Sequence, residues 1–137
     1  MRSRSGTVLR YEQELLGACL DWPLAMTIAN TEGLEPYHFT SHLATLHGPF
    51  FHMLRQMYNR GVLPRPDAAG FIFDLMEQAH WPPTWDGAQR LGFIDSLWCP
   101  SGNLSIYVRR LCRGLRAEYK YTETGKRQLG PFKTLSL

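Results

Sequence analysis

One amphipathic stretch, residues 46–61, constrains the fold more than any other part of the sequence. Its large apolar residues recur at steps of three and four, the period of one helical face, and they are Leu46, Phe50, Met53, Leu54, Met57 and Tyr58. Pro49 stands in the first turn, where its missing N–H costs little, and Gly61 is typical of the position after a helix end. We therefore predict the central helix of a small helical core, with a methionine-rich binding groove as the alternative.

The length and composition are those of one globular domain. The chain has 137 residues, of which 44% are apolar, enough to build one core. No apolar run approaches the roughly 18 residues of a membrane span, and residues 1–10 lack the apolar segment of a signal peptide. Three cysteines without a CxxC motif favour a reduced protein. We expect a cytoplasmic protein without a membrane segment.

Helical periodicity continues along most of the chain and predicts about six helices. The expected ranges are 11–22, 23–29, 46–61, 68–79, 85–98 and 104–119, the last one capped by Asn103. No pair of stretches alternates as paired strands do. The fold class is therefore all-α, a compact bundle whose core includes Leu16, Phe50, Leu54, Leu97 and Leu111. We divide the chain into a flexible basic arm at 1–10, a helical domain at 11–121 and a flexible C-terminal tail at 122–137.

Two motifs stand near opposite ends of the expected helical domain. The first is Glu12-Gln13-x-x-Leu16-Gly17-x-x-Leu20, and the second is Gly92-Phe93-Ile94-Asp95-Ser96-Leu97 followed by Pro100, Asn103 and Tyr107. Between them lie Leu34-x-Pro36-x-x-Phe39, His47, Phe51, Met57, Gly61 and Asp67. In this order and spacing, residues 11–120 resemble the N-terminal domain of DnaB-type replicative helicases. The helicase-binding C-terminal domain of DnaG-type primases has a related fold.

This resemblance implies a DnaB N-terminal-domain-like bundle and a role in DNA replication. In that family a second long helix and an ATPase domain follow, whereas residues 121–125 here predict a helix stop. The chain is thus similar to a stand-alone, non-catalytic relative, such as a plasmid or phage could carry. The implied partners are the replicative helicase, its primase or the helicase loader. A homodimer is a further expectation, although the hairpin through which the family pairs is incomplete here.

Two residues of these motifs carry packing expectations of their own. Gly17 lies inside a predicted helix, where glycine costs about 1 kcal/mol relative to alanine, so we expect another helix to pass close to it. Tyr107 lies one turn after the Asn103 cap. We expect its ring to pack on the core while its hydroxyl stays in water.

The residues that could bind a nucleotide or a metal do not form a recognisable motif. The one Gly-Lys pair, at residues 125–126, lacks the remaining residues of a phosphate-binding loop. His38 and His42 are four residues apart, but no HExxH motif or cysteine pair completes a metal site. We therefore expect no metal, no cofactor and no ATPase activity.

Acidic and thiol groups suggest no catalytic centre either. Glu12 and Glu14 are expected in the opening turns of a helix, where negative charge suits the helix dipole, and Glu32 and Glu35 flank a turn. Cys112 stands among arginines, which could lower its pKa, but without a partnering base we interpret it as a semi-buried core thiol. The sequence thus predicts that the protein is not an enzyme.

The C-terminal quarter is the basic part of the chain. Residues 101–137 hold eight of the fifteen Lys and Arg residues but only two of the twelve acidic ones. Five cations recur along the last predicted helix and form the candidate partner-binding site: Arg109, Arg110, Arg113, Arg116 and Lys120. They border the apolar stripe formed by Val108, Leu111 and Leu115.

Three interpretations of this basic helix remain open. A solvated face needs no partner, because arginines suit the C-terminal end of a helix. An acidic protein surface suits the forked donors of guanidinium groups. Nucleic acid would be bound weakly and non-specifically, through phosphates, because no base-reading residues are evident. We expect an adaptor that binds the helicase, primase or loader and modulates replication initiation, with a small basic DNA-binding regulator as the alternative.

Overall fold

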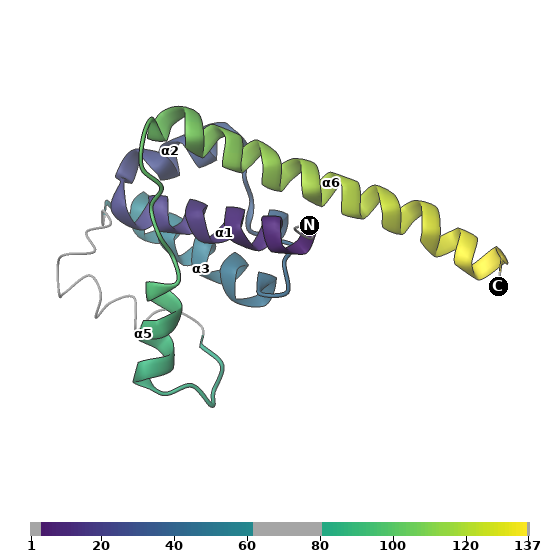
Figure 1. The fold of residues 1–137 in the computed structure, drawn as a ribbon, viewed down its shortest axis with the longest axis horizontal. Helices are drawn as coiled ribbons and strands as arrows, with labels where there is room; N and C mark the ends of the chain where they lie inside the picture. Colours follow the sequence, from purple (N-terminus) through teal and green to yellow (C-terminus); the bar gives the residue numbers. More distant parts are fainter. Residues whose placement is uncertain (1–3, 62–80, 137) are drawn as a thin grey trace.

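Figure 1 shows an all-helical chain. The structure is a computed structural model that describes residues 4–61 and 81–136, with side chains described for 6–61 and 81–122. Its elements are α1 (Arg4–Asp21), α2 (Pro23–Thr31), the 3₁₀ helix η1 (Pro36–His38), α3 (Ala44–Asn59), α5 (Gly87–Asp95) and α6 (Leu104–Ser136). No strand occurs within these ranges, so the all-α prediction is confirmed. Five α-helices are described where six were predicted, and the one expected at 68–79 lies outside the described residues.

Helix α1 is the element on which the others pack. It contacts α2, α3 and α6, so the predicted central helix, α3, lies to one side of it (Figure 1). All five residues predicted for the core are buried in one apolar cluster, namely Leu16, Phe50, Leu54, Leu97 and Leu111. Burying a side chain of this size contributes about 1.5–3 kcal/mol, so this cluster is a principal source of the fold's stability.

Helix α3 follows the amphipathic pattern of residues 46–61. Phe50, Met53, Leu54 and Met57 are buried as that pattern predicts. Gly61, just beyond the helix, has a φ of 80°, a conformation that favours glycine. The helix begins at Ala44, however, so Pro49 lies inside it rather than in its first turn.

The connector from α5 to α6 crosses α1 (Figure 1), and Gly17 makes this crossing close. A Cβ atom on Gly17 would overlap the backbone of Trp98. The predicted close approach is thus confirmed, but its partner is a loop and not a helix. The loop leads into the predicted cap of α6, where the Ile106 N–H donates to Asn103 Oδ1 at 3.3 Å.

Helices α1 and α5 differ from their predicted ranges. Helix α1 begins at Arg4 and not at residue 11, so most of the expected arm is helical, because Val8 packs into the core. Helix α5 is shorter than the predicted 85–98, and Asp86 caps it. The Asp86 carboxylate accepts a hydrogen bond from the Gln89 N–H at 2.9 Å, and Gln89 Oε1 accepts one from the Asp86 N–H at 2.8 Å.

Helix α6 is the longest element and extends past the other helices (Figure 1). It continues through the predicted stop at 121–125 to Ser136, so the backbone of residues 122–136, which we had assigned to a tail, belongs to the helix. A single glycine such as Gly125 costs a helix about 1 kcal/mol and does not by itself end it. None of the helices in the described part of the chain has the length and apolar character that crossing a membrane requires.

Candidate partner-binding groove

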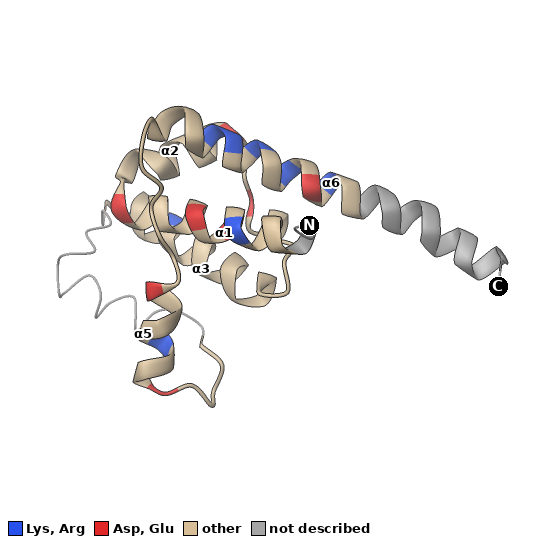
Figure 2. Ribbon diagram, viewed as in Figure 1, with Lys and Arg blue, Asp and Glu red and all other residues tan. Residues whose placement is uncertain are grey.

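The five predicted site residues lie on the exposed side of α6. Arg109, Arg110, Arg113, Arg116 and Lys120 all have exposed side chains. Figure 2 shows them as blue segments along the part of α6 that lies over the body of the molecule. The neighbouring stripe of Val108, Leu111 and Leu115 is buried, as predicted. The cations therefore border a buried apolar seam.

A groove of about 620 Å³ lies between α6 and η1, and we call it the basic groove. Its lining includes three of the five predicted site residues, Arg113, Arg116 and Lys120. Arg109 and Arg110 lie outside it. The opposite wall comes from η1, whose contribution the sequence analysis did not anticipate.

The turn after α2 holds two of the groove's guanidinium groups. Arg113 Nε donates to Glu32 Oε1 at 2.9 Å, and Arg113 Nη2 to Glu32 Oε2 at 3.4 Å. Arg116 Nη1 donates to the Glu32 backbone carbonyl at 2.8 Å. The chain turns at Gly33, which has a φ of 74°. Both arginines are thus oriented before any ligand arrives, which lowers the entropy lost on binding.

An aromatic cluster lines the groove, with Tyr37 and His38 on the η1 wall opposite the cations and Tyr119 beside them on α6. The rings of Tyr37 and Tyr119 have centroids 5.2 Å apart, and the His38 ring lies 4.5 Å from the first and 5.1 Å from the second. Tyr37 and His38 come from η1, and Tyr119 comes from α6, more than 80 positions later in the chain. Sequence reasoning missed Tyr37, His38 and Tyr119 because only the tertiary fold brings them beside the arginines.

His38 is buried in this wall in its neutral form. Its Nδ1 accepts a hydrogen bond from the Glu35 backbone N–H at 2.8 Å, so the remaining ring proton is assigned to Nε2. Burial lowers the pKa of His38, and the positive charge of Arg116 lowers it further, whereas Glu35 acts in the opposite direction. A neutral imidazole adds a hydrogen-bond donor to the groove without adding charge.

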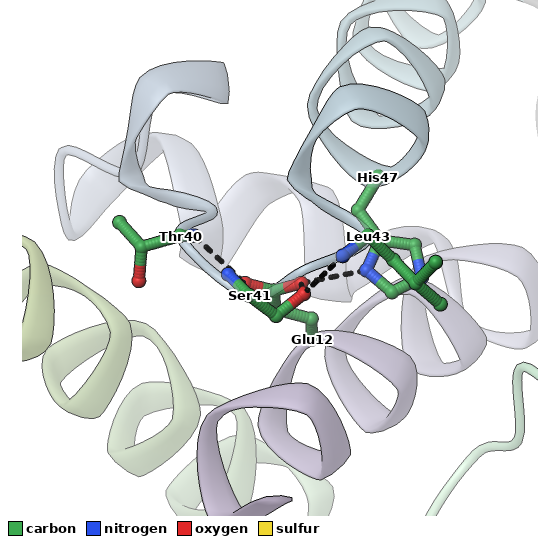
Figure 3. Close-up of polar contacts among 5 residues, drawn as sticks. All are labelled: Glu12, Thr40, Ser41, Leu43 and His47. Carbon is green, nitrogen blue, oxygen red and sulfur yellow. Dashed lines mark hydrogen bonds and ion pairs between the residues drawn. The ribbon is translucent and has the colours of Figure 1, made fainter. Parts of the chain in front are cut away.

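The Glu12 carboxylate anchors the segment that follows η1 to α1 (Figure 3). Its Oε2 accepts the backbone N–H groups of Thr40 and Ser41 at 2.9 and 3.0 Å. Its Oε1 accepts the Ser41 hydroxyl at 2.5 Å and lies 2.6 Å from His47 Nδ1. Glu12 and His47 are fully buried. This network holds residues 40–47, and with them the η1 wall of the groove.

The Glu12 network corrects the prediction that Glu12 and Glu14 serve the helix dipole. Helix α1 begins at Arg4, so both carboxylates lie past its opening turns, and both are buried. Glu14 Oε2 accepts the Tyr107 hydroxyl at 2.6 Å, which ties α6 to α1 and raises the pKa of Tyr107. The expectation that this hydroxyl stays in water was therefore wrong.

Arg55 of α3 fixes the other end of the η1 segment. Its Nη1 donates to Glu35 Oε1 at 3.0 Å, and its Nη2 donates to the Leu34 carbonyl at 2.5 Å. The same guanidinium carbon lies 4.8 Å from the centroid of the Phe51 ring, a cation–π contact. The η1 segment is thus held by α1 on one side and by α3 on the other.

His38 and Cys112 take structural positions in the fold. Among the described residues, no three His, Cys, Asp or Glu side chains cluster in a way that could hold a metal ion. His38 is buried against Glu35 while His42 is exposed, so the pair does not share a site. Cys112 is a core thiol, as predicted, and burial raises its pKa to about 12 despite the nearby Arg116.

No family model matches this chain, and neither a curated protein nor a solved structure matches it. The functional argument therefore depends on the residues of the groove themselves. What the groove offers is two positioned guanidinium groups, one further ammonium group and an aromatic wall. That arrangement suits a ligand that carries carboxylate or phosphate groups.

Proposed function

We propose that this protein is a non-catalytic adaptor that holds an acidic segment of a partner protein in the basic groove. The observation that carries the proposal is the convergence of Arg113, Arg116 and Lys120 on one groove opposite an aromatic wall. Lys120 forms no ion pair with any described side chain. The groove thus keeps a net positive charge after Glu32 has paired with Arg113.

The internal contact with Glu32 supports a carboxylate ligand. Arg113 already binds that carboxylate through two nitrogens, the fork geometry that carboxylates share with few other groups. The groove sets these cations beside the exposed ring of Tyr37, and arginine and tyrosine are both enriched at protein interfaces. A helix that binds in the major groove of DNA would more often present a wholly polar side to the bases.

The partner we infer is a component of the replication machinery. Residues 11–120 resemble the N-terminal domain of replicative helicases, and that resemblance makes the helicase, its primase or its loader the candidates. The proposed outcome of binding is a change in replication initiation.

The alternative function is a small basic DNA-binding regulator. Arg109 and Arg110 are exposed outside the groove, and residues 101–137 carry eight cations. Contacts of this kind would reach phosphates, and the affinity would fall steeply as salt rises. We favour the adaptor because the groove combines its cations with three aromatic rings at fixed distances.

A matched pair of charge reversals tests the proposal. The tagged protein is purified from its native cell, and retained helicase, primase and loader are measured by mass spectrometry for the wild type, Lys120→Glu and Arg110→Glu. Both residues are exposed on α6, but only Lys120 lines the groove. We expect the first variant to lose the replication protein and the second to retain it.

A DNA shift assay at two salt concentrations tests the alternative function. Tight, salt-resistant and sequence-specific DNA binding, with no replication protein retained by the wild type, would favour the regulator. Equal loss in both variants would place the binding on the general charge of α6 and not in the groove.

A further inference from the structure

A second hollow, of about 520 Å³, lies on the other side of η1. Residues of the η1 segment and of α3 line it, among them Pro36, Phe39, Thr45 and Pro49. Among the described residues that line it there is no lysine or arginine. We call it the apolar hollow, and its volume lies within the range of sites that hold a bound group.

The backbone of α3 is fitted to this hollow at two places. A Cβ atom on Gly48 would lie 3.0 Å from the Pro36 carbonyl oxygen, so glycine allows α3 and η1 to meet at its floor. Pro49 cannot donate a hydrogen bond to the Thr45 carbonyl, which therefore lacks the backbone donor that any other residue would supply. Thr45 and Pro49 both line the hollow.

Tyr37 is the wall that the two sites share. It lines both the basic groove and the apolar hollow, and its side chain is 59% exposed. Its neighbours in η1, Pro36 and His38, line the hollow and the groove respectively. The sites are therefore adjacent, and one extended segment of a ligand can occupy both by crossing Tyr37.

We propose that the segment bound here is a short peptide with one large apolar side chain next to two or more carboxylates. The apolar side chain fills the hollow beside Pro49, and the carboxylates meet Arg116 and Lys120 in the basic groove. This inference rests on the proposed function and names the chemistry of the partner's docking segment. Charge complementarity selects the acidic part, and removal of apolar surface from water favours the anchor.

A nucleic acid fits this pair of sites less well. Each nucleotide adds a phosphate, so a strand that crosses Tyr37 would place negative charge at a hollow whose described lining holds no lysine or arginine. A peptide can carry its charges at one end only. The division into a cationic site and an apolar site thus matches a peptide sequence that is divided in the same way.

The test is a selection of random peptides displayed on phage against the full chain. We expect the enriched sequences to carry an aromatic or large aliphatic residue within a few positions of two or more Asp or Glu. A dye-labelled peptide of the enriched sequence is then titrated by fluorescence anisotropy. The failure to enrich any acidic sequence with an apolar neighbour would overturn the inference.

Two variants of α3 separate the hollow from the rest of the surface. Thr45→Trp places an indole at the lining of the hollow. Gln56→Trp introduces the same side chain at an exposed position of α3 outside the hollow. We expect Thr45→Trp to lower the affinity for the labelled peptide about tenfold or more, as for a lost anchor contact. Gln56→Trp should leave that affinity unchanged. Lys120→Glu should weaken it as well. Circular dichroism melts confirm that each variant is folded.

The outcomes distinguish this inference from the proposed function. Replication protein retained by the wild type, lost in Lys120→Glu and unaffected by Thr45→Trp would overturn the apolar anchor and leave the adaptor function standing. A single-stranded oligonucleotide that binds in place of the peptide, and that Lys120→Glu releases, would overturn both.

Discussion

The Arg113 guanidinium holds the Glu32 carboxylate through two contacts, of 2.9 and 3.4 Å, across 81 positions of the sequence. The pair joins α6 to the turn that follows α2 at the edge of the basic groove. Both partners are thus part of the fold and part of the candidate site. The carboxylate orients the guanidinium, but it also occupies the donors that an acidic ligand would use.

The first prediction concerns this internal competition. Glu32→Gln keeps an oxygen that can accept from Arg113 but removes the negative charge beside the groove. We expect a dye-labelled polyglutamate peptide to bind the variant more tightly and to associate faster, with the gain shrinking as salt rises. Stopped-flow anisotropy at two salt concentrations measures both quantities.

Asp95→Asn is the control for the Glu32 experiment. It removes one negative charge at an exposed position of α5, which contributes nothing to the lining of the groove. Its association rate should stay close to that of the wild type. Equal acceleration in the two variants would mean that net charge alone, and not the position of Glu32, controls binding.

The second prediction concerns the buried Glu12 network. Glu12→Ala leaves the N–H groups of Thr40 and Ser41 and the ring of His47 without their shared acceptor. Because these groups are buried, we expect a loss of about 3 kcal/mol or more in the free energy of unfolding. Urea denaturation measures it, and Gln13→Ala, the neighbouring half-buried position, should cost far less.

The Glu12 variant also tests how the groove is positioned. The same segment carries the η1 wall, so a variant that remains folded should show altered chemical shifts at Tyr37 and His38. A stability equal to that of the wild type would show that water satisfies these groups and that Glu12 is not the anchor.

The sequence was sufficient to predict the class of the fold and the α6 side of the candidate groove. Regular spacing of apolar residues reveals which helix face is buried, so the core residues Leu54 and Leu111 and the cationic stripe of α6 were predicted correctly. The wall formed by Tyr37 and Tyr119 was not, because it exists only where η1 meets α6. Periodicity describes one helix at a time and carries no information on such pairings.

The role of Glu12 could not be predicted for a related reason. A carboxylate within an amphipathic helix usually faces water, and nothing in the local sequence distinguishes one that is buried. Its burial depends on the N–H groups of residues 40 and 41, nearly thirty positions away. The first residues of α1 and α5 also depend on individual contacts. Val8 packs into the core and extends α1 toward the N-terminus, and the Asp86 side chain caps the start of α5.

The third prediction compares two glycines. Gly17→Ala should destabilise the protein by roughly 1–3 kcal/mol or more, since its Cβ would overlap the Trp98 backbone, which has no flexible end to move aside. In Gly92→Ala, in α5, the added Cβ meets no atom of the described residues within 4 Å, so this change should stabilise the protein by about 0.5–1 kcal/mol. Thermal and urea unfolding of the two variants measure the difference, and the same sign in both would contradict the loop crossing.

The last prediction concerns pH and the neutral state of His38. Burial and the Arg116 charge lower the pKa of this residue below its ordinary 6.5. Between the folded and the unfolded pKa the unfolded chain binds more protons, so stability must rise with pH there. We therefore expect the contribution of neutral His38 to stability to be fully present above pH 6.5 and to be lost as the pH falls from 6.5 toward the folded pKa.

His38→Gln should remove this part of the pH dependence, and an NMR titration of the ring should give a pKa below 6.5. A bound acidic ligand stabilises the imidazolium, so polyglutamate should move that pKa upward. A ring that titrates at or above 6.5 without ligand would contradict the buried geometry.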